Sequence, residues 1–162
     1  MKTASGAWLL GLAVAGSSPS FASSPITAEG TLERYCEPLI AGSTASEITE
    51  DARANGFQPD VVGGHPVLVQ GEFVLGISDD PRVCMVQAPP SMTFAQGLSL
   101  VDAWAARHSG ARRGAATQGP DGAPVRLWAV PEQEKYLLVS EQTTALGHKV
   151  LNFIMAPLPK GF

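Results

Sequence analysis

The chain has 162 residues, a formal net charge of −4 and 44% hydrophobic residues, which suits one folded domain with a buried core. Binding a nucleic acid backbone requires clustered Lys and Arg, and the only basic cluster is Arg107, Arg112 and Arg113. These arginines fall near the end of a predicted helix, where cations stabilise the helix dipole. We therefore expect no nucleic-acid partner.

Residues 1–22 have the anatomy of a secretory signal peptide. Lys2 supplies the positive start, residues 7–15 are apolar, and Ser20 to Ala22 place small residues where a signal peptidase reads them. The stretch is short for a permanent transmembrane helix and contains no cysteine to carry a lipid. We expect a periplasmic or secreted protein that begins near Ser23, with no transmembrane segment in the mature chain.

The two cysteines, Cys36 and Cys84, both fall in the predicted mature chain. In an oxidising compartment an even pair predicts a disulfide, and this one would join the first helix to a strand. Closing a loop of about 50 residues stabilises a fold by roughly 4 kcal/mol in the chain-entropy model. The alternative, a nucleophilic cysteine with a histidine base, requires a reduced thiolate.

The first helix is predicted after a lead-in at residues 23–30 that we expect to be mobile. From Thr31 apolar residues recur at helical spacing as far as Gly42. Pro38 removes a helical N–H and crowds the preceding turn, which predicts a kink or an early end near Glu37.

A second, short helix is predicted by a capping box in which Thr44 covers a free amide and Glu47 reaches back. It should run to about Asn55 and end at Gly56 in the left-handed conformation, with Phe57 folding back as an apolar contact. The two helices therefore precede the first strands.

Strands are predicted around Val67 to Val69, Phe73 to Ile77 and Val83 to Val86, after a surface loop at 59–66. Gln70-Gly71 is either a hairpin turn or a bulge in one longer strand. Residues 78–81 form the turn before the cysteine strand.

The clearest helix starts at Thr93, which forms a second capping box with Gln96, and reaches about Arg107. Gly97 inside this helix suggests close approach of a neighbouring element. Residues 110–124 are rich in glycine and form a loop.

Three more strands are predicted at 125–130, 136–140 and 149–156, with turns at 131–134 and 146–148. The last strand is apolar on both faces, which favours a central place in the sheet. The expected fold is one α+β domain at 31–162, with an antiparallel sheet of five to six strands and helices on one face. The predicted order is α-α-β-β-(β)-α-β-β-β.

Chemistry-bearing motifs are sparse. His65, His108 and His148 have no metal-ligand spacing between them, so solvated or capping roles are the simpler interpretation of each. The adjacent carboxylates Asp79 and Asp80 suit a turn better than a cleft. We expect no metal and no cofactor.

Trp128 and Tyr136 flank the turn at 131–134, where they could face outward on the sheet. Ordinary packing is the simpler interpretation, and the alternative is a binding surface formed by both aromatics with Arg112 and Arg113. Absence of a nucleophile, metal cluster or cofactor loop favours a noncatalytic domain. Its expected partner is a protein or envelope component, bound through the sheet face or the 110–124 loop. Two alternatives are a small hydrolase using a histidine and a carboxylate, and a small-ligand carrier enclosed between helix 93–107 and the sheet.

Overall fold

The computed structural model describes residues 25–119, 121–144 and 146–159, so the predicted signal peptide lies outside the described residues. The helical segments are α1 (Ala28–Thr31), the π-helical turn η1 (Leu32–Cys36), α2 (Glu37–Ala41), α3 (Ala45–Ala54), α4 (Phe94–Ala106) and the 3-10 turn η2 (Pro131–Gln133). The strands are β1 (Gln58–Val62), β2 (His65–Gln70), β3 (Phe73–Asp79), β4 (Arg82–Gln87), β5 (Arg112–Arg113), β6 (Thr117–Gln118), β7 (Pro124–Val130), β8 (Lys135–Thr143) and β9 (Lys149–Pro157).

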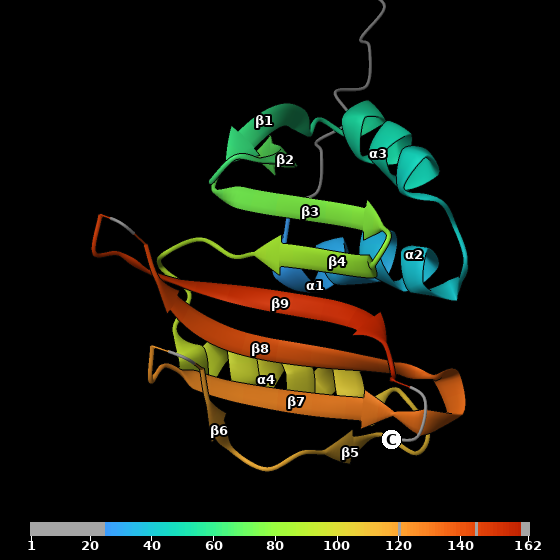
Figure 1. Cartoon of the computed structure of the whole chain (residues 1–162), viewed down its shortest axis with the longest axis vertical. Coiled ribbons are helices and arrows are strands. Elements are labelled where there is room, and N and C mark those ends of the chain that lie inside the picture. The colour runs from blue at the N-terminus through green and yellow to red at the C-terminus, as the bar shows by residue number, and fades with distance from the viewer. Residues whose placement is uncertain (1–24, 120, 145, 160–162) are drawn as a thin grey trace, which may run out of the picture.

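The strands form one antiparallel sheet in the order β1-β2-β3-β4-β9-β8-β7-β5, with β6 also paired to β7. In Figure 1, α1, α2 and α4 lie behind the sheet, and α4 carries the chain from β4 to the edge strand β5. The α+β class and the antiparallel sheet are confirmed. The predicted five to six strands are too few for this nine-stranded sheet, because β1, β5 and β6 carry no strand periodicity.

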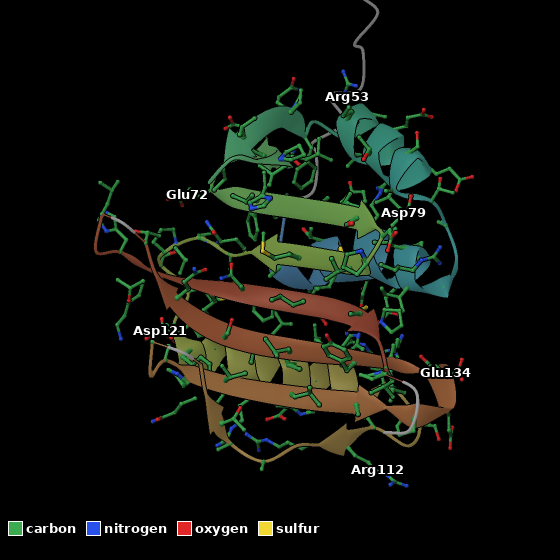
Figure 2. The ribbon with its side chains drawn as sticks, viewed as in Figure 1. Arg53, Glu72, Asp79, Arg112, Asp121 and Glu134 are labelled. Carbon is green, nitrogen blue, oxygen red and sulfur yellow. A yellow bond between two sulfur atoms is a disulfide. The ribbon has the colours of Figure 1, made fainter. Side chains whose placement is uncertain are left out.

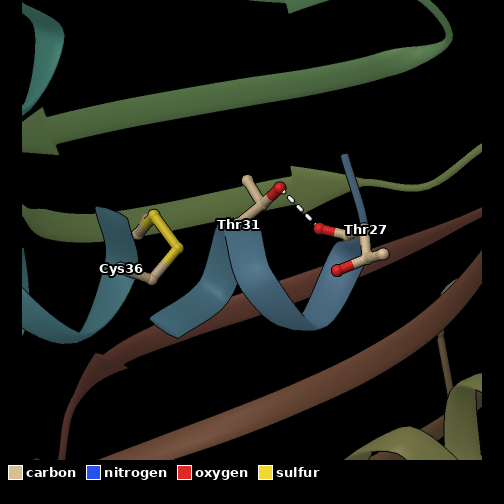
Figure 3. Close-up of a disulfide and its surroundings, with 4 residues drawn as sticks. Thr27, Thr31 and Cys36 are labelled. Carbon is tan, nitrogen blue, oxygen red and sulfur yellow. Dashed lines mark hydrogen bonds between the residues drawn. A yellow bond between two sulfur atoms is a disulfide. The ribbon is translucent and has the colours of Figure 1, made fainter. Parts of the chain in front are cut away.

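The first helix begins at Ala28, earlier than the apolar periodicity predicts, because Thr27 caps it by accepting from the Gly30 N–H at 3.0 Å. The Thr31 hydroxyl donates to the Thr27 carbonyl at 2.7 Å (Figure 3). A π-helical turn precedes Pro38, at the place of the predicted kink, because proline crowds the preceding turn. The helical run therefore continues past the proline to Ala41.

The Cys36–Cys84 disulfide joins this first helical run to β4, as predicted (Figure 3). The two Cα atoms lie 5.2 Å apart, and both cysteines are fully buried. The bridge therefore fixes the N-terminal helices to a central part of the sheet.

The capping boxes of α3 and α4 are both present as predicted. At the end of α3, Gly56 has a φ of 98°, and the Phe57 N–H donates to the Ala52 carbonyl at 3.1 Å. Phe57 is 1% exposed, so this turn delivers an aromatic ring to the core.

Residues 59–66 form a hairpin, so the predicted surface loop is wrong. Gly63 and Gly64 are its two-residue turn, with φ values of 58° and 83° that suit glycine. The next connection is also a hairpin turn, at Gly71 and Glu72, which excludes the bulge.

The core lies between the helices and one face of the sheet. Gly97 of α4 packs so closely that an added Cβ would lie 2.8 Å from Leu151 Cδ1 of β9, which confirms the predicted close approach. This contact leaves no room for a ligand at that point. Strand β9 lies between β4 and β8, so its predicted central place is confirmed.

Candidate functional site

The second face of the sheet, here called the open face, carries no packed helix in the described part of the chain. Register and alternation place its side chains opposite to those of the core cluster. Figure 1 looks on to this face. Its partly buried apolar members are Val69, Val83, Met85, Leu127, Tyr136, Leu138 and Ile154, whereas Val67, Val74, Ala129, Val150 and Ala156 on the same face are only 4–9% exposed.

An apolar row crosses the middle of the open face. Leu127 pairs with Leu138, which pairs with Ile154, and Ile154 pairs with Met85. All four side chains are partly buried. An added Cβ at Gly76 would lie 3.3 Å from Met85 Cε, so this glycine makes room for the methionine. The row therefore offers continuous apolar surface from β7 to β4.

A polar row runs beside the apolar one. Gln87 pairs with Asn152, and Asn152 pairs with Ser140. Asn152 is 5% exposed and donates to Gln142 Oε1 at 2.9 Å, whereas its Oδ1 has no hydrogen-bond partner among the described residues. A buried hydrogen-bond acceptor without a donor lowers the stability of the fold, and Asn152 Oδ1 is such an acceptor on the open face.

The β1 edge of the sheet is closed to strand addition. Val62 and His65 flank the two-residue turn and form a hydrogen-bonded pair. Because the direction of the backbone groups alternates along a strand, the backbone nitrogens of Val61 and Pro59 point away from β2. Pro59 has no N–H, and the Val61 N–H already donates to Asp60 Oδ1 at 2.7 Å. A further strand would find no free donor here, although Val61 is 64% exposed.

The opposite edge is the two-residue strand β5. Arg112, labelled in Figure 2, pairs with Ala129, which pairs with Tyr136, so Arg112 lies on the open-face side of the sheet in the same cross-strand row as Tyr136. Arg113 pairs with Trp128 and lies over its ring, 5.3 Å from the centroid. Such a short, charged edge is also poorly suited to strand addition.

Trp128 is not on the open face, so the favoured interpretation of ordinary packing is confirmed for this residue, and the alternative, in which it faces outward with Tyr136, is wrong. It is 2% exposed, and its Nε1 donates to Asp102 Oδ1 on α4 at 3.0 Å. Tyr136 lies on the open face and is partly buried. The four residues proposed as one surface are therefore divided, with Arg112 and Tyr136 on one side and Arg113 and Trp128 on the other.

A polar cluster on the covered face joins α2, α4 and β8. Trp104 Nε1 donates to Glu37 Oε1 at 2.7 Å, and the Lys135 ammonium donates to Glu37 Oε2. His108 Nδ1 lies 2.8 Å from the Trp104 carbonyl oxygen, and Lys135 Nζ lies 3.3 Å from His108 Nε2. Lys135 is 5% exposed, so this charge is almost withdrawn from water.

The hydrogen bonds assign the tautomer of His108. A carbonyl only accepts, so Nδ1 carries a proton, while Nε2 lies 3.3 Å from both Lys135 Nζ and Glu37 Oε1. Every polar atom of this arrangement has a partner, which suits a structural tie. Sequence reasoning missed the cluster because Glu37 and Lys135 are 98 positions apart and no motif links them.

A shallow groove beside the cluster is lined by Glu37, Pro38, Ile40, Ala41, Gln133 and Lys135. The other two histidines, His65 and His148, are exposed at a strand start and in a turn. No group of three metal-ligating side chains gathers within the described ranges. Asp79, predicted as a turn residue, also accepts the Ala45 N–H at 3.0 Å at the start of α3.

The perturbed ionisable groups lie on the helices, away from the open face. The hydrogen bond from Arg34 lowers the pKa of Asp51, and the amide and hydroxyl of Thr44 lower the pKa of Glu47. Burial raises the pKa of Tyr35. These shifts follow from helix capping, an ion pair and core packing, and they mark no catalytic site.

No helix within the described ranges is long and apolar enough to cross a membrane. Comparison of the chain with protein-family models, with curated proteins and with solved structures gives no match.

Proposed function

We propose that this chain is an exported, noncatalytic domain that binds a protein through the open face of its sheet. The observation that carries the proposal is the apolar row of Leu127, Leu138, Ile154 and Met85 on a face without a packed helix in the described part of the chain. Extended apolar patches on a protein surface commonly mark interaction sites.

The two sheet edges support binding by the face rather than by strand addition. Pro59 and the bond from Val61 to Asp60 remove the free donors of β1, and β5 is only two residues long. A partner would therefore bury side chains of the open face. Each square ångström of apolar surface removed from water contributes about 0.025 kcal/mol.

Export is proposed on two features, the leader anatomy of residues 1–22 and the buried disulfide between Cys36 and Cys84. Intact mass measurement of the protein from its own host tests this part. We expect a chain that begins near Ser23 and carries no free thiol. A chain that retains residues 1–22 in its final compartment would contradict export.

Photo-crosslinking in the host tests the binding surface. A photoreactive phenylalanine analogue replaces Leu138 on the open face, and the matched control places it at Ser99, which is exposed on α4. We expect one discrete protein adduct from position 138 and none from position 99. Equal labelling at both positions, or no adduct from position 138, would contradict the proposal.

A small hydrolase is the second candidate, because one of the three histidines meets a carboxylate. His108 Nε2 lies 3.3 Å from Glu37 Oε1, beside the groove that Glu37 and Lys135 line. Both ring nitrogens are engaged, and the described lining holds no serine, threonine or cysteine nucleophile. For any activity found, H108A should abolish it and H65A should leave it unchanged if this candidate is right.

A further inference from the structure

We infer that the partner of the open face is a second copy of this chain, packed face to face as a two-sheet sandwich. The inference rests on the proposed function, because it uses the same surface. Figure 1 shows β4 and β9 adjacent in the middle of the sheet. Four strands, β1 to β4, lie on one side of that boundary, and β9, β8, β7 and β5 lie on the other.

This strand order defines a symmetric way to stack two copies. A two-fold axis parallel to the strands, above the β4–β9 boundary, places β4 of each chain over β9 of the other. The same axis places β1 over β5. Sheets packed in this way lie about 10 Å apart, with their inner side chains interdigitated.

Apolar side chains meet apolar side chains in this arrangement. Met85 and Ile154 are directly paired across the β4–β9 boundary, so the axis places Met85 of each copy over Ile154 of the other. Leu138 and Leu127 continue the row outward. Eight strands about 4.8 Å apart make the face roughly 34 Å wide, and strands of about six residues at about 3.4 Å each make it roughly 20 Å long. The resulting area of about 700 Å² is close to the roughly 800 Å² that each chain buries in a standard interface.

The amide row is also self-complementary. Gln87 and Asn152 are paired across the same boundary, so each Asn152 faces the Gln87 of the second copy. Asn152 Oδ1 is itself buried within its own chain, so the stack lays one amide row over the other without a bond to that atom.

Opposite charges meet at the two ends. Asp60 on β1 and Arg112 on β5 are both exposed, and neither forms an ion pair in the described ranges. Asp60 pairs with Val67 and Arg112 pairs with Ala129, which places both on the open-face side. In the symmetric stack each Asp60 lies over the second copy's β5, and its position is offset from that of Arg112 by two residues along the strand, or about 7 Å. The two contacts form together or not at all.

Sedimentation equilibrium of the oxidised, full mature chain tests the inference. We expect a dimer at about 200 µM chain, and L138E should weaken dimerisation at least tenfold. The matched control S99E, on the opposite side of the molecule, should leave it unchanged. Circular dichroism verifies that each variant is folded.

A charge-exchange experiment avoids any change to the apolar row. D60R and R112D should each dimerise about tenfold more weakly alone, because each places like charges at both ends of the stack. An equimolar mixture of the two should restore dimers. In the mixed dimer the arginine introduced at position 60 faces the aspartate introduced at position 112, and the native Arg112 of one chain faces the native Asp60 of the other. No restoration in the mixture would overturn the inference.

The failures of the two proposals are distinguishable. A chain that stays monomeric at about 200 µM overturns the second-copy inference. A discrete adduct of another protein at position 138 would then still support binding through the open face. A dimer that survives L138E would also overturn the second-copy inference, because association would then use another surface, whereas the crosslink at position 138 would still decide the proposed function.

Discussion

The two faces of the sheet carry similar apolar residues but differ in what lies over them. On the covered face, Leu137, Val139, Phe153 and their neighbours form one cluster with the helices, and Lys135 and Trp128 each have polar partners. On the open face, Leu138 and Ile154 alternate with these residues along the same strands, and no helix in the described ranges covers them. Strand alternation alone therefore does not identify the buried face of this sheet, because the packing of the helices decides it.

Loss of the disulfide should have the largest effect, because it holds the covering helices on one face. Replacing both Cys36 and Cys84 with alanine should lower the free energy of unfolding by about 4 kcal/mol. Urea unfolding followed by tryptophan fluorescence measures the change. A loss below about 1 kcal/mol would indicate that helix packing holds without the bridge.

Neighbouring leucines on β8 compare the two faces directly. Leu137→Ala should lower the free energy of unfolding by about 3 kcal/mol, because Leu137 is fully buried in the core. Leu138→Ala should cost about 1 kcal/mol or less in the monomer, because Leu138 is partly exposed. The two variants are compared by urea unfolding at low protein concentration. Equal losses would mean that the open face is covered as well.

Two lysine–glutamate ion pairs, one with a buried lysine and one with an exposed lysine, compare the effect of burial on a polar contact. Lys135→Met should cost about 2 kcal/mol, because it removes the ammonium beside the partly buried Glu37. The control is Lys149→Met, whose side chain is 69% exposed in its pair with Glu141, and which should change stability by less than about 0.5 kcal/mol. Thermal unfolding of both variants tests the difference, and a larger loss from the exposed lysine would refute it.

The exposed Arg34–Asp51 pair should have the smallest effect. Because Arg34 lowers the folded-state pKa of Asp51, the contribution is present above the unfolded pKa of about 4 and is lost as pH falls through the folded value. Both side chains are about half exposed, so Asp51→Asn should cost less than about 1 kcal/mol at pH 7 and almost nothing at the acid end. Urea midpoints from pH 7 to pH 2 measure this, with the exposed Glu50→Gln as control. A difference that grows toward acid pH would contradict the assigned direction.

Local signals in the sequence predicted much of the fold. The capping boxes at Thr44 and Thr93 placed two helices, Gly97 indicated a close approach, and the exported context predicted the disulfide. The capping boxes and the glycine are signals within a few neighbouring residues, and the disulfide was predictable because the chain has only two cysteines.

Other features depend on tertiary pairing and were not predictable. The hairpin at 58–70 reads as a loop because Pro59, Asp60 and two glycines dominate its sequence, although these residues are suited to an edge strand. The face of Trp128 was ambiguous because Trp128, Ala129 and Val130 are consecutive apolar residues without alternation. The Glu37–Lys135 contact joins segments that only the folded chain brings together.

A dilution series of methyl-labelled protein, followed by NMR, tests whether the open face binds a second copy. Methyl groups of Leu127, Leu138 and Ile154 report on the open face, and those of Leu137 and Leu151 report on the covered face within the same spectrum. If the open face binds a second copy, only the first group should shift or broaden as the concentration rises. Methyl signals of the open face that remain unchanged over the whole series would show that this face does not bind a second copy.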